Sequence, residues 1–318
     1  MELKSLLLSS ILNANCPVCS SRVSRDFVTT KALMHKANDE KFYFNLCENC
    51  DTVFLTNPVA PAELESYYTE NYLPYKGADA WGRFSNFVEK SQKKLDLKRV
   101  KLVQKFLKQK QKSVHILDVG CGNPSFLDLV EKKLQFTCTG IDFSDAGWRG
   151  KEFNNLTLVN TSIEDFEADQ LFDVITLWHF LEHDYDPPKT IAKLHNFLKP
   201  GGKIVIEVPD YVSISRRRQR ENWQGWHSPR HLSLFSEKSF SVLFDQEKWI
   251  IKKHLRYGTL DAFTLWWLGK MEKKGISWSG NMEPEFWPLV GLKVLTFPFF
   301  IFEKLVPFGI QILVVEKK

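Results

Sequence analysis

The chain has 318 residues, of which 43% are hydrophobic and 25% charged, a composition that indicates a globular protein and excludes a disordered or fibrous one. The formal net charge of +5 permits an acidic partner without requiring one. Six cysteines in a chain of this length do not indicate a disulfide-stapled mini-domain. No apolar run reaches the roughly 18 residues of a membrane span. The length predicts about two domains.

Residues 1–60 are predicted to form a zinc-ribbon-like module. Their weakly apolar start, Leu6–Leu12, lacks the basic flank and cleavage site of a signal peptide, so we expect a cytoplasmic protein. Two Cys-x-x-Cys pairs follow, and each can place two thiolates on a tight turn. The four cysteines, Cys16, Cys19, Cys47 and Cys50, are predicted to hold one structural zinc with no open coordination position. Redox activity is disfavoured because there are two pairs and neither opens a βαβ unit.

Residues 61–112 are predicted to be a helical connector that ends in a basic amphipathic helix. From Lys90 to Lys112 there are ten Lys or Arg and one acid, Asp96, while apolar residues recur with helical spacing from 97 to 107. A second cluster is Arg216–Arg220. Either surface can simply be solvated, or can attract RNA, anionic lipid or a phosphorylated sugar. RNA is not favoured, because no aromatic residues are interleaved as in an RNA groove.

From residue 113 short apolar runs alternate with helical patterns, which predicts a doubly wound α/β sheet. The expected strands are 114–118, 137–142, 156–159, 172–177, 203–208, 249–255 and 310–315. A helix at 190–198 is expected to stop at Pro200-Gly-Gly. The first strand runs into a turn with Gly120 and Gly122, where the backbone can approach a ligand at the start of a helix. Asp142 ends the next strand, where a carboxylate can accept both hydroxyls of a ribose.

These motifs resemble those of the class I S-adenosylmethionine-dependent methyltransferases, over residues 113–257 and the last strand. A nicotinamide dehydrogenase also uses a glycine-rich turn, but the Leu-Lys-Pro-Gly-Gly turn and the late strand at 310–315 favour the methyltransferases. The resemblance implies that the methionine part of the cofactor lies at Asp118, Gly120 and Gly122, and the ribose and adenine at Asp142, Phe143, Ser162 and Ile163. Trp178 is a further expected cofactor-binding residue. Pro124 stands where the family usually has a third glycine.

Histidines near the methyl position are the candidate catalytic residues. His179, Glu182 and His183 have the i, i+3, i+4 spacing of one helix face, and His227 and His231 follow in a later loop. A hydroxyl or carbon acceptor needs a base, and we expect His179 to serve, with His183, His227 or His231 in support.

The same residues resemble a divalent-metal arrangement in ubiquinone-pathway and small-RNA 2′-O-methyltransferases, which implies a second metal at Glu182 and His183, with His179 and a loop histidine. The alternative is that Glu182 and His183 only cap and orient the helix. The His-x-x-Glu-His spacing also matches a zinc-protease signature, but its position after a methyltransferase-type strand argues against proteolysis.

An apolar insertion is expected at about 259–308, before the last strand. Seven residues of 286–308 are Phe or Trp, and prolines are expected to break the segment into pieces too short to span a bilayer. It can pack on the sheet, cover an apolar acceptor, or contact the inner face of the membrane peripherally.

The predicted fold is therefore α/β, a seven-stranded Rossmann-like methyltransferase sheet with an N-terminal zinc module and a helical insertion; the methyltransferase domain is 113–318. The plan resembles bacterial methyltransferases of sugars and polysaccharide assembly, and implies methyl transfer from S-adenosylmethionine to oxygen or carbon of a small-molecule, sugar or lipid-linked acceptor. Two alternatives stay open: an RNA methyltransferase, and a non-catalytic binding protein if Pro124 blocks the cofactor.

Overall fold

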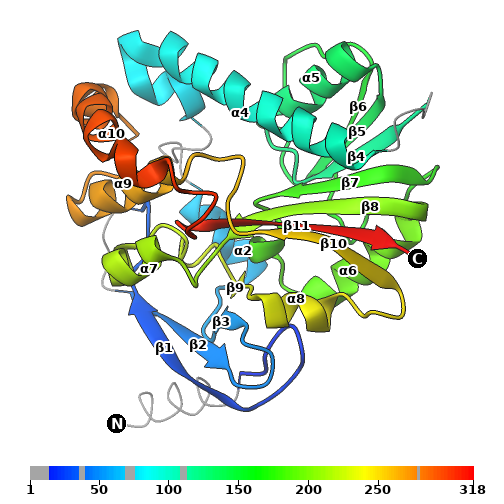
Figure 1. Cartoon of the computed structure of the whole chain (residues 1–318), viewed down its shortest axis with the longest axis horizontal. Coiled ribbons are helices and arrows are strands. Elements are labelled where there is room, and N and C mark those ends of the chain that lie inside the picture. The colour runs from blue at the N-terminus through cyan, green and yellow to red at the C-terminus, as the bar shows by residue number, and fades with distance from the viewer. Residues whose placement is uncertain (1–13, 36–39, 69–75, 108–112, 278–279) are drawn as a thin grey trace.

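The computed structural model describes residues 14–35, 40–68, 76–107, 113–277 and 280–318 (Figure 1). The weakly apolar start and the last five residues predicted for the basic helix, 108–112, lie outside the described residues. The described chain forms a large mixed sheet with helices on both faces, a small antiparallel sheet, and a group of helices beyond one end of the large sheet (Figure 1).

The large sheet has seven strands in the order β10-β11-β8-β7-β4-β5-β6, which confirms the predicted fold class. They are β4 (His115–Val119), β5 (Thr137–Asp142), β6 (Leu156–Asn160), β7 (Phe172–Trp178), β8 (Leu198–Pro209), β10 (Trp249–Leu255) and β11 (Ile310–Lys317). β4 to β8 run parallel, whereas β11 runs antiparallel to β8 and to β10. The central strands are continuous apolar runs because both faces of a parallel sheet are covered, and β7 is buried along its whole length.

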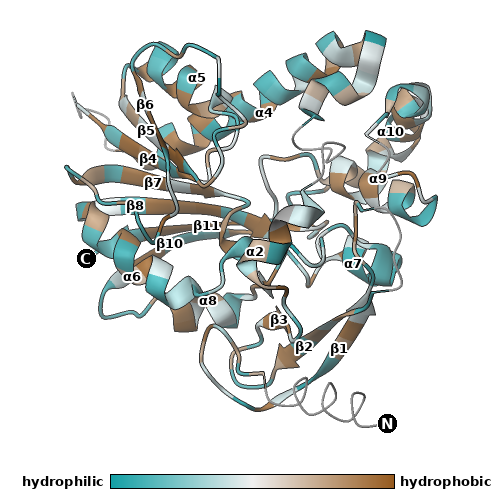
Figure 2. Cartoon of the chain, turned by 180° about the vertical axis from the view of Figure 1, so that it is seen from behind, coloured by the Kyte–Doolittle hydropathy of each residue, from teal (hydrophilic) through white to brown (hydrophobic). Residues whose placement is uncertain are grey.

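Helices α4 (Ser85–Phe106) and α5 (Ser125–Leu134) cover one face, and α6 (Pro187–Phe197) and α8 (Glu237–Leu243) cover the other (Figure 1). The basic segment lies in α4 as far as Phe106, with Val100 and Val103 buried, and both hydrophilic and hydrophobic residues lie along this helix (Figure 2). α6 ends close to its predicted end, but β8 already begins at Leu198. The Pro-Gly-Gly sequence therefore lies inside β8, where Gly201 has a φ of 76° that suits glycine.

The small sheet consists of β1 (Ser24–Thr30), β2 (Phe42–Cys47), β3 (Val53–Leu55) and β9 (Ser233–Leu234). β9 comes from the chain after β8, so a late segment completes the sheet of the first 60 residues. Phe54 and Phe235, next to β9, belong to the same buried cluster as Ile206 of β8. The two sheets therefore share a hydrophobic core.

The chain between β10 and β11 is helical, with α9 (Ala262–Lys273), η5 (Glu283–Glu285) and α10 (Phe286–Phe300). The prediction that prolines break this segment is wrong for α10, which contains both Pro288 and Pro298. Pro288 lies in the first turn, where the missing N–H would have no helical partner, and Pro298 lies in the last turn. The short helices are η2 (Gly77–Phe84), α2 (Pro61–Leu64), η1 (Glu65–Tyr67), η3 (Leu181–His183), α7 (Ile214–Gln219) and η4 (Arg220–Asn222).

Candidate active site and metal sites

The four predicted zinc ligands form one cluster beside the small sheet. Cys16 and Cys19 lie on a turn before β1, Cys47 is the last residue of β2, and Cys50 lies on the turn after β2. The sulfur of Cys16 is 3.5 Å from that of Cys50, and the sulfur of Cys19 is 3.6 Å from that of Cys47. Sulfur ligands of a tetrahedral zinc are about 3.8 Å apart, since each Zn–S bond is about 2.3 Å. The donor set and its spacing therefore fit one zinc with four protein ligands.

The predicted glycine turn lies at the carboxyl edge of the large sheet, directly after β4. Gly120 and Gly122 have φ angles of 70° and 50°. A Cβ on Gly120 would lie 2.6 Å from the ring of Phe180, so this position requires glycine for space as well as for conformation. A Cβ on Gly122 would have no described atom within 4 Å apart from those of its two chain neighbours, so Pro124 does not fill this side of the glycine. The turn therefore leaves room for a ligand on this side of Gly122, whereas Gly147 lies close to its carbonyl on another side.

Asp142 ends β5 beside this turn. Its two carboxylate oxygens accept hydrogen bonds from the backbone N–H groups of Gly122, at 2.9 Å, and Ser144, at 3.0 Å. Burial raises the pKa of Asp142, although these bonds oppose the shift. Each oxygen can accept a further donor, such as a ribose hydroxyl. Phe143 is 65% exposed next to it, which leaves its ring available to a nucleobase.

The other two residues expected near the adenine follow β6. The Ser162 hydroxyl donates to Asp165 at 2.9 Å and accepts its backbone N–H at 3.2 Å, which forms a short turn. The neighbouring Thr161 donates its N–H to the carbonyl of Asp142, so this turn lies at the same edge of the sheet. Ile163 is 5% exposed and belongs to the main core cluster.

Asp118 and Trp178 are both buried at the ends of their strands. Asp118 accepts a 2.5 Å hydrogen bond from the hydroxyl of Thr176. Burial raises the pKa of Asp118 to about 7, although this hydrogen bond opposes the shift. The Trp178 ring meets the edge of Phe126 and lies 4.7 Å below the guanidinium of Arg99. Trp178 therefore packs against α4 and α5, and its role at the cofactor stays a prediction.

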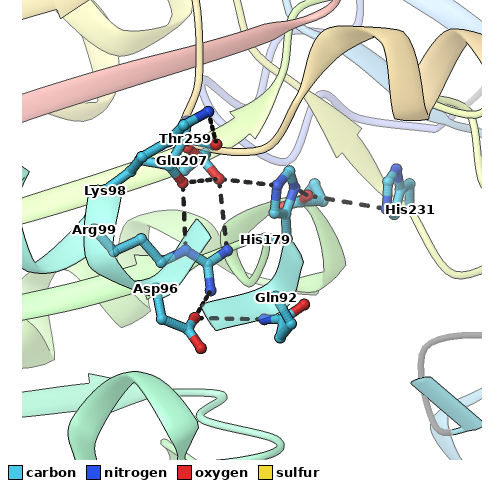
Figure 3. Close-up of polar contacts among 9 residues, drawn as sticks. Gln92, Asp96, Lys98, Arg99, His179, Glu207, His231 and Thr259 are labelled. Atoms are coloured by element: carbon cyan, nitrogen blue, oxygen red, sulfur yellow. Dashed lines mark hydrogen bonds and ion pairs between the residues drawn. The ribbon is translucent and has the colours of Figure 1, made fainter. Parts of the chain in front are cut away.

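His179 lies close to two buried glutamates, Glu182 and Glu207, and Figure 3 shows its contact with Glu207. Its Nδ1 is 3.1 Å from Glu182, and its Nε2 is 3.2 Å from Oε1 of Glu207. The same oxygen of Glu207 lies 3.5 Å from the guanidinium of Arg99 and accepts the Thr259 hydroxyl at 3.0 Å. This cluster joins β7, β8, α4 and the start of the insertion.

The glutamates set the protonation of His179. Burial alone would lower its pKa, but the two carboxylates outweigh burial and raise the pKa to about 9. Burial alone would raise the pKa of Glu207, but His179 and Arg99 outweigh it and lower the pKa to about 2. Both carboxylates therefore favour the protonated imidazole, and a protonated ring cannot accept another proton. This state does not suit the general-base role expected for His179.

The predicted helix that carries His179, Glu182 and His183 on one face is wrong. His179 has a φ of 56°, which ends β7 in a turn, and η3 is only a single turn. α6 begins later because Asp186 accepts the N–H of Lys189 and Pro187 occupies the first helical position. Folding of the loop, and not helical periodicity, therefore brings the three residues close together.

Glu182, His183 and His231 place one possible ligand atom each within 4.8 Å of one another. Nδ1 of His183 is 3.0 Å from the carbonyl of Arg230, and Nδ1 of His231 is 2.8 Å from the carbonyl of Gly225. Because a carbonyl can only accept, both Nδ1 atoms carry hydrogen and both Nε2 atoms keep a lone pair. Burial lowers the pKa of both rings, which favours the neutral form.

Glu182, the carboxylate among these three residues, also has an oxygen available for a ligand. Glu182 is fully buried, and its Oε2 has no hydrogen-bond partner within the described part of the chain. A buried oxygen without a partner is costly, and a divalent cation would satisfy it. The donor set of one carboxylate and two imidazoles therefore fits a divalent metal. His227 lies beside the group, but its Nε2 accepts a 3.0 Å hydrogen bond from Arg230.

Sequence reasoning missed the residues that surround His179. A signal existed for Glu207, because a charged residue inside an apolar strand needs a partner. Asp96 also gave a signal as the single acid of a basic segment; it is buried and accepts the Ser125 hydroxyl at 2.8 Å. Thr259 gave none, since its bonds to Glu207 depend on how the insertion returns to the sheet.

A family model described as a methyltransferase domain matches residues 88–247, which are half of the chain. The chain is 35% identical over 97 residues to a ubiquinone biosynthesis O-methyltransferase of Saccharophagus degradans, which is 28% of this chain and 41% of that protein. It is 33% identical over 114 residues to one from Coxiella burnetii, covering 33% and 47% of the two chains. The matched part spans less than half the length of these curated relatives.

Among solved structures, the chain is similar to the cyclopropane synthase MmaA2 from Mycobacterium tuberculosis, with 15% identity and a TM-score of 0.47 over 70% of this chain and 84% of that one. It is also similar to the N-methyltransferase NodS from Bradyrhizobium japonicum WM9, with 13% identity and a TM-score of 0.41 over 70% and 87%. The family match confirms the resemblance seen in the sequence motifs: the chain belongs to the class I S-adenosylmethionine-dependent methyltransferases.

Proposed function

We propose that this protein transfers a methyl group from S-adenosylmethionine to a hydroxyl oxygen of a small-molecule, sugar or lipid-linked acceptor. One observation carries the proposal: the sheet edge that holds the glycine turn and Asp142 also leads, through His179, to the Glu182–His183–His231 group. A cofactor site and an acceptor site are needed side by side for direct transfer. The O-methyltransferase names of the curated relatives support oxygen over carbon as the methylated atom.

The glycine turn and the residues near it would hold the cofactor. Bound S-adenosylmethionine supplies an electrophilic methyl group on its sulfonium. In the proposed arrangement Asp118, Gly120 and Gly122 hold the methionine part. The ribose and adenine would lie at Asp142, Phe143, Ser162 and Ile163, and Trp178 would be a further cofactor-binding residue.

As the acceptor oxygen takes the methyl group, S-adenosylhomocysteine would leave and the hydroxyl proton would pass to water. The Glu182–His183–His231 group would assist the loss of this proton. A divalent metal held by this group would polarise the hydroxyl and lower its pKa. His179 then acts as a positioning residue, because its Nδ1 holds one oxygen of Glu182 and leaves the other oxygen for the metal. His227 holds the side chain of Arg230, which precedes His231.

The cysteine cluster would have a separate, structural role. We propose that Cys16, Cys19, Cys47 and Cys50 bind one zinc that stabilises the small sheet, since all four positions around the ion would be filled by protein. Such a site has no position left for substrate.

The test is transfer of labelled methyl from S-adenosylmethionine to three acceptor pools: soluble metabolites, a lipid extract, and RNA. We expect label in a hydroxyl compound of the first or second pool, and a loss of about a hundredfold in Glu182→Gln, which removes a metal ligand. Glu221→Gln is the matched control, since Glu221 is an exposed carboxylate of η4, and it should leave transfer unchanged. Label in RNA alone, or full activity of Glu182→Gln, would refute the proposal.

A further inference from the structure

The outer surface of α10 and the turn after it expose a patch of large apolar side chains. The α10 patch consists of Trp287, Val294, Leu295, Phe297, Phe299, Ile301, Phe302 and Leu305, each more than half exposed. These are eight of the seventeen exposed large hydrophobic side chains of the described residues, gathered within one short segment. A contiguous patch of this kind on a soluble protein marks an interaction site.

The patch is not left over from poor packing, because α10 has its own core contacts on its other side. Phe286 is buried and stacks on Phe84 with ring centroids 3.8 Å apart. Leu289, Val290 and Phe300 are partly buried against the cluster formed by η2 and α9. α10 is thus apolar on the packed side and also on the exposed side, a pattern found in helices enclosed by protein or lipid on all sides.

The charges around the patch indicate what covers it. Within 286–308 the charged residues are Lys293, Glu303 and Lys304. The neighbouring α4 adds exposed lysines along its length: Lys90, Lys93, Lys94, Lys98, Lys101 and Lys105. α4 is close to the patch, since Phe87 of α4 is 65% exposed and its ring lies 5.8 Å from that of Phe286. Lysines beside an apolar surface attract anionic lipid, and would repel a second copy of the same surface.

We propose that the α10 patch inserts into the interface of a bilayer that contains anionic lipid. α10 has 15 residues, which is shorter than the roughly 20 residues needed to span a bilayer, so it would lie in the interface. Within the described residues, no helix is both long and apolar enough to cross a membrane.

The position of the patch gives this contact a consequence for the acceptor. β11 starts beside the carboxyl end of β8, with Ile310 paired to Pro209, and α10 directly precedes β11. α9 and α10 lie beyond this end of the sheet in both views (Figures 1 and 2). Bilayer contact would therefore place the carboxyl edge of the sheet near lipid, which suits a lipid-linked acceptor. This consequence rests on the proposed function, whereas the contact itself does not.

The experiment is flotation of the full chain with vesicles of phosphatidylcholine alone or mixed with phosphatidylglycerol. The patch variant is Leu295→Asp with Phe297→Asp, and the matched control is Val23→Asp with Val242→Asp, at exposed apolar positions elsewhere. We expect wild type and control to float with mixed vesicles, the patch variant to bind about tenfold less, and Lys90→Glu with Lys94→Glu to lose the preference for phosphatidylglycerol.

Titration of each variant with S-adenosylhomocysteine separates this inference from the proposed function, because the patch variant should bind that ligand as wild type does. Three results would overturn the inference: equal flotation of wild type and patch variant, no flotation of wild type, or a dimer in light scattering that the patch variant dissociates. The last result would assign the patch to a second copy of the chain.

Discussion

Glu207 is a fully buried carboxylate whose charge depends on its neighbours. It lies in β8, its pKa is held at about 2, and Arg99 and His179 are the cations beside it. A buried pair contributes little by itself, but loss of one partner leaves an uncompensated charge in the core. The stability of the fold should therefore depend on Arg99 of α4, although α4 lies outside the sheet.

Replacing Arg99 with methionine tests this dependence. Arg99→Met keeps an apolar side chain of similar length over Trp178 but removes the charge, so we expect the free energy of unfolding in urea to fall by about 3–5 kcal/mol. Lys101→Met, an exposed position on the same helix, should change it by less than about 0.5 kcal/mol. Equal effects of the two substitutions would show that Arg99 does not compensate Glu207.

Asp118 predicts a pH dependence of folding stability. Its folded-state pKa of about 7 lies above the ordinary value of 3.8, because burial disfavours the charged form. The stabilisation from the protonated form is therefore complete below the ordinary pKa and is lost as the pH rises through about 7. Wild type should lose stability relative to Asp118→Asn between pH 5 and pH 8 in urea unfolding. A difference between the two proteins that does not change with pH would contradict the prediction.

At the scale of elements, local signals in the sequence predicted most of the fold. All seven strands of the large sheet coincide with apolar runs in the sequence, and the turns at the cysteine pairs were predicted from the Cys-x-x-Cys spacing. The prediction of a helix directly after β7 is wrong, because the histidine and glutamate spacing imitates a helix face. Asp186 and Pro187 set the start of α6 instead. The pairing of Arg99 with Glu207 could not be predicted, since it depends on how α4 packs over the sheet.

The small sheet predicts a test of the cysteine cluster. Cys16, Cys47 and Cys50 lie in the same buried cluster as Phe235 and Phe240, so loss of a metal there should destabilise the core that both sheets share. We expect about one tightly held zinc per chain in the purified protein, and a lower midpoint of thermal unfolding in Cys47→Ser. Cys138→Ser is the control, because Cys138 is a buried cysteine of β5 outside the cluster. Far less than one zinc per chain would exclude the proposed site.

At the scale of the whole molecule, the three predicted parts are connected more closely than the sequence suggested. The small sheet takes β9 from the chain after β8, and α4 contacts the sheet, α5 and the start of the insertion. The candidate site draws on each of these connections, since Arg99 comes from α4, Thr259 from the insertion, and His231 from the loop before β9. This combination of residues could not be predicted by treating the parts of the sequence as independent modules.

The most direct test of the proposed function is calorimetric titration with S-adenosylhomocysteine. We expect one binding site per chain in wild type, and an affinity lower by about tenfold or more in Asp142→Ala, which removes the proposed ribose acceptor. Asp145→Ala is the matched control. Asp145 follows Asp142 by three residues and pairs with Arg149 at the surface, so this variant should bind as wild type does. Absence of binding by wild type, or equal binding by Asp142→Ala, would contradict the proposed cofactor site.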